Sequence, residues 1–173
     1  METVEKLQIL AESAKYDVSC SSSGSKPRKS SPNAVGDVKV SGICHTFTSD
    51  GRCVSLFKVL MTNYCIYDCR YCINRTSNDI KRALMTPREI CELTISFYKR
   101  NYIEGLFLSS GIVKNPSHTM ELLLETVKML REEYFFMGYI HLKAIPGADS
   151  LLISKAGEYV DRLSSNIELP SKE

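Results

Sequence analysis

The sequence lacks the features of a membrane-spanning or exported protein. Its 173 residues contain no apolar run of about 18 residues, the length that a helix needs to cross a bilayer. The first residues, METVEKLQILAES, include acidic side chains and lack the apolar core of a secretory signal. The net charge of +2 is too small by itself to indicate a nucleic acid or a membrane as partner. We therefore expect a cytoplasmic protein without a membrane contact.

The cysteine content does not fit a disulfide framework. A chain without an export signal is expected in a reducing compartment, and an odd number of cysteines cannot pair completely. Clustered thiols in such a compartment more often hold a metal or do redox chemistry. Cys91 differs from the rest because it lies in an amphipathic helical pattern, where we expect an ordinary buried residue. The seven cysteines are Cys20, Cys44, Cys53, Cys65, Cys69, Cys72 and Cys91.

From Val54 onward, strand patterns alternate with helix patterns. Helices are predicted to begin near Thr86, Asn115 and Ala148, and Thr86 with Glu89 forms a capping-box pattern. The alternation indicates βαβ units with a parallel sheet, and hence an α/β fold. About four such units make half of a TIM-type (β/α) barrel, which needs about 250 residues. The chain therefore looks truncated, or it needs a partner. The predicted strands are VSLFKVLMTN, LFLSSG, YIHLKAIPG and RLSSNIELP.

We divide the chain into two parts. Residues 1–53 are expected to form an N-terminal extension, with a helix over 1–19 and a Ser-, Gly- and Pro-containing loop over 20–35. Residues 36–53 contain turn signals and two cysteines. Residues 54–173 are expected to form the N-terminal half of the barrel.

Three cysteines follow the first predicted strand in the segment NYCIYDCRYC. Cys65, Cys69 and Cys72 have the spacing C-x3-C-x2-C, at the carboxyl end of the sheet, where barrel enzymes build their active sites. Three thiolates could bind zinc, with a histidine or a fourth cysteine completing the tetrahedron. They could also bind an iron–sulfur cluster. In a four-iron cluster, three protein ligands leave one iron open to a small molecule, as a catalytic site requires.

This spacing, with the aromatic Tyr71 directly before the last cysteine, resembles the signature of the radical S-adenosylmethionine superfamily. The resemblance implies a 4Fe–4S cluster on Cys65, Cys69 and Cys72, whose open iron is chelated by S-adenosylmethionine. It implies reductive cleavage of that cofactor to methionine and a 5′-deoxyadenosyl radical, which takes hydrogen from a substrate. It also implies a flavodoxin- or ferredoxin-like electron donor.

The same resemblance assigns cofactor contacts. Tyr71 would lie near the adenine, and the serine–glycine segment that ends the second strand would bind the methionine amine. The common family form of that segment is Gly-Gly-Glu, and Ser-Ser-Gly is also ordinary turn chemistry. For His141 we expect a hydrogen-bonded core residue, and for Lys143 a solvated or helix-facing side chain. The assigned cofactor residues are Tyr71, Ser109, Ser110, Gly111, Asn166 and Glu168.

Three further cysteines precede the triad. Cys20, Cys44 and Cys53 could ligate an auxiliary cluster, or Cys44 and Cys53 could bind another metal with His45. The interpretation as plain thiols is favoured, since their spacing matches no tight ligand loop.

The longer segment GICHTFTSDGRCVSLFKVLMTNYCIYDCRYCINR is similar to one radical S-adenosylmethionine subfamily, associated with DNA modification or repair and with uracil-DNA glycosylase-like partners. Members of that subfamily are longer, and their C-terminal part completes the barrel and includes segments suited to gripping DNA. The DNA connection is therefore implied by kinship alone. Two other hypotheses stay open: a non-catalytic zinc or iron–sulfur module, and an inactive half-barrel remnant.

Overall fold

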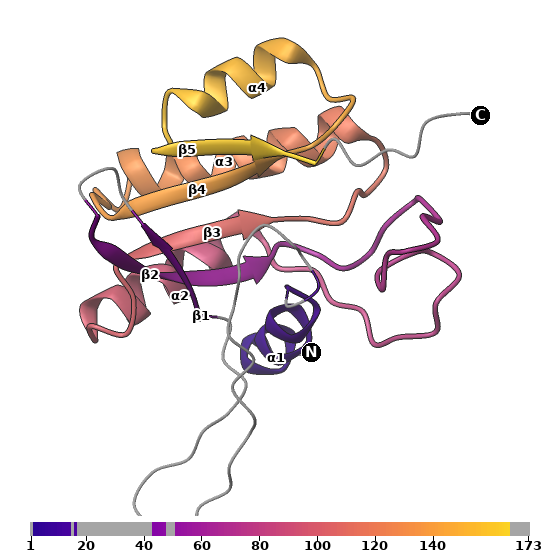
Figure 1. The fold of residues 1–173 in the computed structure, drawn as a ribbon, viewed down its shortest axis with the longest axis horizontal. Coiled ribbons are helices and arrows are strands. Elements are labelled where there is room, and N and C mark those ends of the chain that lie inside the picture. Colours follow the sequence, from indigo (N-terminus) through magenta and orange to yellow (C-terminus); the bar gives the residue numbers. More distant parts are fainter. Residues whose placement is uncertain (1, 15, 17–42, 48–50, 167–173) are drawn as a thin grey trace, which may run out of the picture.

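The computed structural model describes residues 2–14, 16, 43–47 and 51–166, which form a mixed α/β fold (Figure 1). Five strands make a curled half-barrel sheet, and four helices accompany it. This arrangement confirms the predicted α/β class and is consistent with a partial barrel, whereas the TIM type of that barrel stays a prediction. In chain order the elements are α1 (Thr3–Ala14), β1 (Ile43–Phe47), β2 (Cys53–Leu60), α2 (Pro87–Lys99), β3 (Gly105–Ser109), α3 (Pro116–Glu132), β4 (Tyr139–Ala144), α4 (Ser150–Gly157) and β5 (Arg162–Ser165).

The strands follow one another across the sheet in the order β1-β2-β3-β4-β5. The pairs from β2 to β5 are parallel, as the alternation of strands and helices predicts. β1 runs antiparallel to β2, with Ile43 opposite Phe57, and the sequence analysis missed it. It is a short edge strand in which only Cys44 and Thr46 are buried, so it has no long apolar run to reveal it.

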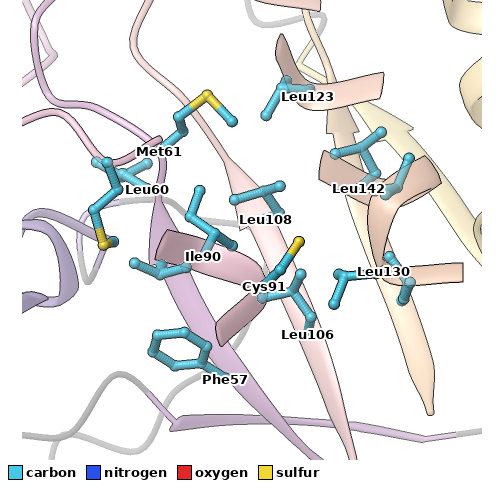
Figure 2. Close-up of a cluster of buried hydrophobic side chains, with 14 of the residues drawn as sticks. Phe57, Leu60, Met61, Ile90, Cys91, Leu106, Leu108, Leu123, Leu130 and Leu142 are labelled. Carbon is cyan, nitrogen blue, oxygen red and sulfur yellow. The ribbon is translucent and has the colours of Figure 1, made fainter. Parts of the chain in front are cut away.

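The helices cover one face of the sheet, and the core lies between them (Figure 2). Alternate residues of the central strands point to this face, among them Phe57 on β2 and Leu106 on β3. Cys91 of α2 is fully buried in the same cluster, and its Sγ donates to the carbonyl oxygen of Thr126 at 3.5 Å. Burial raises the pKa of Cys91 to about 12. The prediction that Cys91 is a core residue is confirmed.

Several buried polar residues lie on the face opposite the helices. The Nζ atom of Lys58 on β2 lies 5.4 Å from the ring centroid of Phe107, and that ring lies 4.4 Å from the imidazole ring of His141. Nε2 of His141 and the Oγ atom of Ser164 on β5 are 2.7 Å apart. His141 is therefore a buried, hydrogen-bonded residue, as predicted. This face supplies the interior of the half-barrel, where these polar side chains lie beside the buried apolar residues Leu56 and Phe107.

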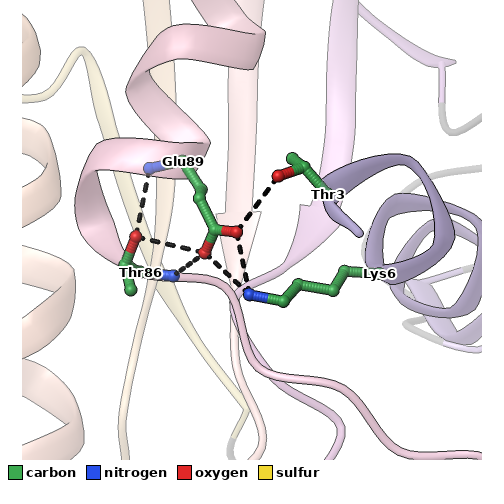
Figure 3. Close-up of polar contacts among 4 residues, drawn as sticks. All are labelled: Thr3, Lys6, Thr86 and Glu89. Atoms are coloured by element: carbon green, nitrogen blue, oxygen red, sulfur yellow. Dashed lines mark hydrogen bonds and ion pairs between the residues drawn. The ribbon is translucent and has the colours of Figure 1, made fainter. Parts of the chain in front are cut away.

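Glu89 joins two helices at the edge of the fold (Figure 3). Its carboxylate accepts from the backbone N–H of Thr86 at 2.8 Å and closes the predicted capping box of α2. The same carboxylate accepts from Lys6 of α1 at 2.8 Å and from Thr3 at 3.2 Å. Burial favours a higher pKa for Glu89, but the hydrogen bonds from Lys6 and Thr86 outweigh it, so the pKa lies below its usual value. One side chain thus caps α2 and attaches α1 to it.

Among the described ranges, no helix is long and apolar enough to cross a membrane. α1 ends at Ala14, and the rest of the helix predicted over 1–19 lies almost wholly outside the described residues. The last predicted strand is described only as far as Ser165, followed by Asn166. The division of the chain after residue 53 stays a prediction.

We predict that Glu89→Gln lowers the free energy of unfolding by about 1 kcal/mol at neutral pH, because the ion pair with Lys6 is lost. A carboxyl with a depressed pKa stabilises the fold above its unfolded pKa, and this contribution is lost as the pH falls through the folded pKa. The wild type should therefore lose stability below about pH 4.3 more steeply than the variant. Urea denaturation between pH 3 and pH 7 measures both effects. Glu133→Gln is the control, because Glu133 only pairs with Arg88 at the exposed surface. If the free energy of unfolding depends on pH in the same way in the wild type and in Glu89→Gln, the assigned role of Glu89 is contradicted.

Candidate metal centre

The cysteine loop, defined here as residues 63–83, connects β2 to α2. An antiparallel bridge between Thr62 and Leu84 closes it at its base. The loop projects beyond the carboxyl ends of the strands, as the magenta segment after β2 in Figure 1. Cys65, Cys69 and Cys72 lie within it, and all three are half-buried. The prediction that the triad follows a strand at this end of the sheet is confirmed.

Backbone hydrogen bonds shape the segment that holds the thiols. The N–H of Cys72 donates to the carbonyl oxygen of Cys69 at 2.9 Å, which closes a tight turn around Tyr71. The N–H of Ile66 donates to the carbonyl oxygen of Ile112 at 2.9 Å. This second bond links the start of the triad to the segment that follows β3.

Asp68 connects the middle of the triad to a later part of the loop. Its Oδ1 atom accepts from the hydroxyl of Ser77 at 2.6 Å and from the backbone N–H of Ser77 at 3.1 Å. These two hydrogen bonds lower the pKa of Asp68. The N–H of Thr76 also donates to the carbonyl oxygen of Tyr67 at 3.0 Å. The loop is therefore folded back on itself.

Two polar side chains hold the base of the loop, and the sequence analysis named neither. Asn63 is fully buried; its Nδ2 atom donates to the carbonyl oxygen of Lys81 at 2.8 Å, and its Oδ1 atom accepts from the N–H of Ala83 at 2.8 Å. Nδ2 of Asn63 also donates to Ser13 of α1 at 3.2 Å. Arg82 donates to four backbone carbonyl oxygens of the loop. In the sequence these side chains look like solvated polar residues, and only the folded loop distinguishes them.

A cavity of about 780 Å³ opens between the cysteine loop and the carboxyl ends of the strands. Its volume falls within the range of about 300–1,000 Å³ that is typical of small-molecule sites. The structure brings together around this cavity all the triad and cofactor residues that the sequence analysis assigned within the described ranges. They are Cys65, Cys69, Tyr71, Cys72, Ser109, Ser110, Gly111 and Asn166. The remaining assigned cofactor residue, Glu168, lies outside the described residues.

Lys143 also lines the cavity, which corrects one expectation. The side chain was expected to be solvated or to face the helices, but Lys143 is buried and borders the cavity from β4. Its neighbour Leu142 belongs to the core on the helix side, and successive side chains of a strand point to opposite faces. Lys143 therefore points to the face opposite the helices, together with His141.

Two buried side-chain oxygens at the cavity have no hydrogen-bond partner among the described residues. They are the Oγ atom of Ser109, which is 2% exposed, and the Oδ1 atom of Asn74. A buried polar atom without a partner costs about 1–3 kcal/mol, so both atoms are available to hydrogen-bond a water molecule or a polar ligand in the cavity. The sequence analysis assigned Ser109 by its place at the end of a strand, but no pattern singled out Asn74.

Gly111 allows the loop and the sheet to approach each other closely. A Cβ atom at this position would lie 2.3 Å from the carbonyl oxygen of Tyr64 and 3.1 Å from that of Thr62. The N–H of Gly111 also donates to the carbonyl oxygen of Thr62 at 2.7 Å. The glycine is therefore required for the backbone contact that places the triad beside the segment after β3.

The upstream cysteines lie elsewhere. Cys53 begins β2, whereas the triad follows the end of β2, so the two are at opposite ends of the strand. Cys44 is fully buried beside Leu56 and Phe107. Cys53 is exposed, with its Sγ atom 3.7 Å from Nδ1 of His45. The structure does not bring Cys44 and Cys53 to the cysteine loop, and Cys20 lies outside the described residues.

The donor set fits an iron–sulfur cluster with a small ligand. Three thiols border one cavity, together with polar atoms that lack partners and a backbone contact that only glycine permits. Among the described residues, no three Cys, His, Asp or Glu side chains converge enough to hold a single metal ion. A 4Fe–4S cluster does not require that convergence, because each of its cysteines binds a different iron.

A family model for the 4Fe-4S single cluster domain matches residues 50–145, which include β2, the cysteine loop and β4. The chain belongs to this family. The 4Fe-4S single cluster domain is found in radical S-adenosylmethionine-type proteins. No curated protein matches the chain. The family match identifies a 4Fe–4S cluster-binding domain and supports the cluster interpretation of the triad.

We predict that Gly111→Ala reduces cluster binding by more than half, because the added methyl group displaces the backbone of Tyr64 next to Cys65. Iron and sulfide per chain after anaerobic reconstitution measure the loss. Gly157→Ala is the matched control, since a Cβ atom there meets nothing within 4 Å, and it should load fully. Equal loading of the two variants would show that the contact at Gly111 does not position the triad.

Proposed function

We propose that this protein is a radical S-adenosylmethionine enzyme built on part of a TIM-type (β/α) barrel. Cys65, Cys69 and Cys72 hold a 4Fe–4S cluster, and S-adenosylmethionine occupies the adjoining part of the cavity. The observation that supports this function best is the shared cavity, which Tyr71 and Ser109 line together with the triad. A site for metal storage does not need a cavity for a small molecule beside its thiols.

The residues around the cavity have separable roles in this proposal. When bound, the cluster supplies one electron for reductive cleavage of S-adenosylmethionine to methionine and a 5′-deoxyadenosyl radical. Tyr71 is 65% exposed and offers its ring to the adenine at the rim of the cavity. Ser109 and Asn74 hydrogen-bond polar atoms of the cofactor with the side-chain oxygens that otherwise lack partners. Ile112 and Ile145 form apolar parts of the wall and limit the access of water.

The central experiment is anaerobic reconstitution of the full chain, followed by reduction with dithionite in the presence of S-adenosylmethionine. We expect a brown protein with about four irons per chain, an EPR signal in the reduced state, and 5′-deoxyadenosine as a product. Replacing Cys65, Cys69 and Cys72 by alanine should abolish all three signals. Cys53→Ala is the matched control, because this exposed thiol lies at the other end of β2, and the variant should keep its iron.

Different results would separate the alternatives. Stoichiometric zinc without sulfide would show that the triad forms a zinc site and not an iron–sulfur site. A cluster that binds but yields no 5′-deoxyadenosine would indicate a non-catalytic cluster protein or a half-barrel without activity. Iron clearly above four per chain, lowered to four by Cys53→Ala, would establish an auxiliary cluster.

The proposal includes two partners. A flavodoxin- or ferredoxin-like protein supplies the electron, and the exposed side chains of Tyr64, Ile66 and Tyr67 beside the triad offer it an apolar contact. DNA or a related nucleotide is the substrate, and a uracil-DNA glycosylase-like protein acts with it; this part rests on the resemblance of the cysteine-containing segment. Fluorescence anisotropy with a labelled duplex should detect binding below about 100 μM. If the anisotropy change is no larger than the change that albumin causes with the same duplex, the DNA part of the proposal is contradicted.

A further inference from the structure

We propose that Arg82 is a positioning residue that fixes the spacing of the three cysteines before the cluster arrives. The inference deepens the proposed cluster site and rests on it for its function. Arg82 is not among the residues that line the cavity, so it acts through the backbone of the loop. Its role follows from which groups its guanidinium binds.

The guanidinium of Arg82 donates hydrogen bonds to backbone carbonyl oxygens on both sides of the triad. Nη1 donates to the carbonyl oxygens of Asn63 at 2.5 Å and Asn74 at 3.1 Å. Nη2 donates to those of Arg75 at 2.6 Å and Asn78 at 2.9 Å. Asn63 precedes Cys65 by two residues, and Asn74 follows Cys72 by two residues. One planar cation therefore joins the entry and the exit of the segment that holds all three thiols.

This geometry suits arginine specifically. The guanidinium presents its N–H groups in one rigid plane, whereas a lysine ammonium is a compact charge that cannot reproduce the same fork. Without the guanidinium, the four carbonyl oxygens would have to accept hydrogen bonds from water or from other N–H groups, and the loop would sample many spacings of its thiols. A loop that is ordered beforehand does not lose that conformational freedom when a cluster binds.

The positive charge has a second consequence. Three of the four residues whose carbonyls Arg82 binds, Asn74, Arg75 and Asn78, line the cavity, so the cation is attached to the backbone of the cavity wall. A fixed positive charge near a cluster favours the reduced, more negative state. Arg82 should therefore raise the reduction potential of the cluster as well as order the loop.

The chain contains a matched control for this residue. Arg131 on α3 donates to the backbone carbonyl oxygens of Phe136 at 2.5 Å, Gly138 at 2.8 Å and Tyr159 at 2.9 Å, and to the carboxylate of Asp161 at 2.9 Å. It holds together segments at the amino ends of β4 and β5, away from the cysteine loop. Losing Arg131 removes a comparable set of hydrogen bonds without touching the triad.

The experiment compares Arg82→Lys, Arg82→Gln and Arg131→Gln in the full chain, reconstituted without oxygen. We expect the cluster to be extracted by a chelator about tenfold faster from both Arg82 variants than from the wild type. Arg131→Gln should lower Tm while leaving the extraction rate unchanged. The reduction potential should fall clearly in Arg82→Gln and less in Arg82→Lys, because only glutamine removes the charge. Equal extraction rates for the Arg82 and Arg131 variants would overturn the inference.

A readout in the metal-free protein separates this inference from the proposed function. Hydrogen exchange of the amides in residues 63–83 should become faster in Arg82→Lys and stay as in the wild type in Arg131→Gln. If the wild type binds no cluster but this pattern holds, the proposed function fails and the ordering role of Arg82 stands. Unchanged exchange in Arg82→Lys would overturn the ordering role, whether or not a cluster binds.

Discussion

The candidate site depends on one physical constraint: a long loop without regular structure must satisfy its backbone polar groups. Helices and strands do so internally, but the cysteine loop has only turns and one bridge at its base. Arg82 and Asn63 supply much of what is missing, since between them they bind five carbonyl oxygens and one N–H of the loop. The thiols can then occupy defined positions although no helix or strand holds them.

The sheet provides the fixed surface against which this loop is placed. Parallel strands end at the same edge of the sheet. Three segments that are far apart in the sequence therefore meet there: the cysteine loop after β2, the serine–glycine segment after β3 and Asn166 after β5. The helix-side core keeps that edge rigid, because its buried leucine, isoleucine and phenylalanine side chains fix how the strands lie. Fold stability and site geometry thus come from different faces of the same strands.

The sequence allowed prediction of the features that local pattern determines. The capping box of α2, the triad spacing and the place of Ser109 at a strand end are each encoded within a few neighbouring residues, and the parallel strands follow from the alternation of strand and helix patterns. What escaped prediction depends on distant contacts. β1 is a strand because it pairs with the edge of β2, Lys143 is buried at the wall of the cavity, and Arg82 matters because it binds four carbonyl groups of the loop. Assignments to residues 17–42 and 167–173, Cys20 and Glu168 among them, lie outside the described residues.

The described cysteines show how the surroundings of a thiol determine its chemistry. Cys91 lies in the core, where burial raises its pKa to about 12, so it remains a neutral thiol at physiological pH. Metal binding requires the thiolate, which an apolar core disfavours. Cys65, Cys69 and Cys72 are half-buried beside a cavity, where a metal can reach them. Of the six described cysteines, these three combine access, mutual proximity along one loop and a neighbouring space for a ligand, which is why we assign the proposed cluster to them.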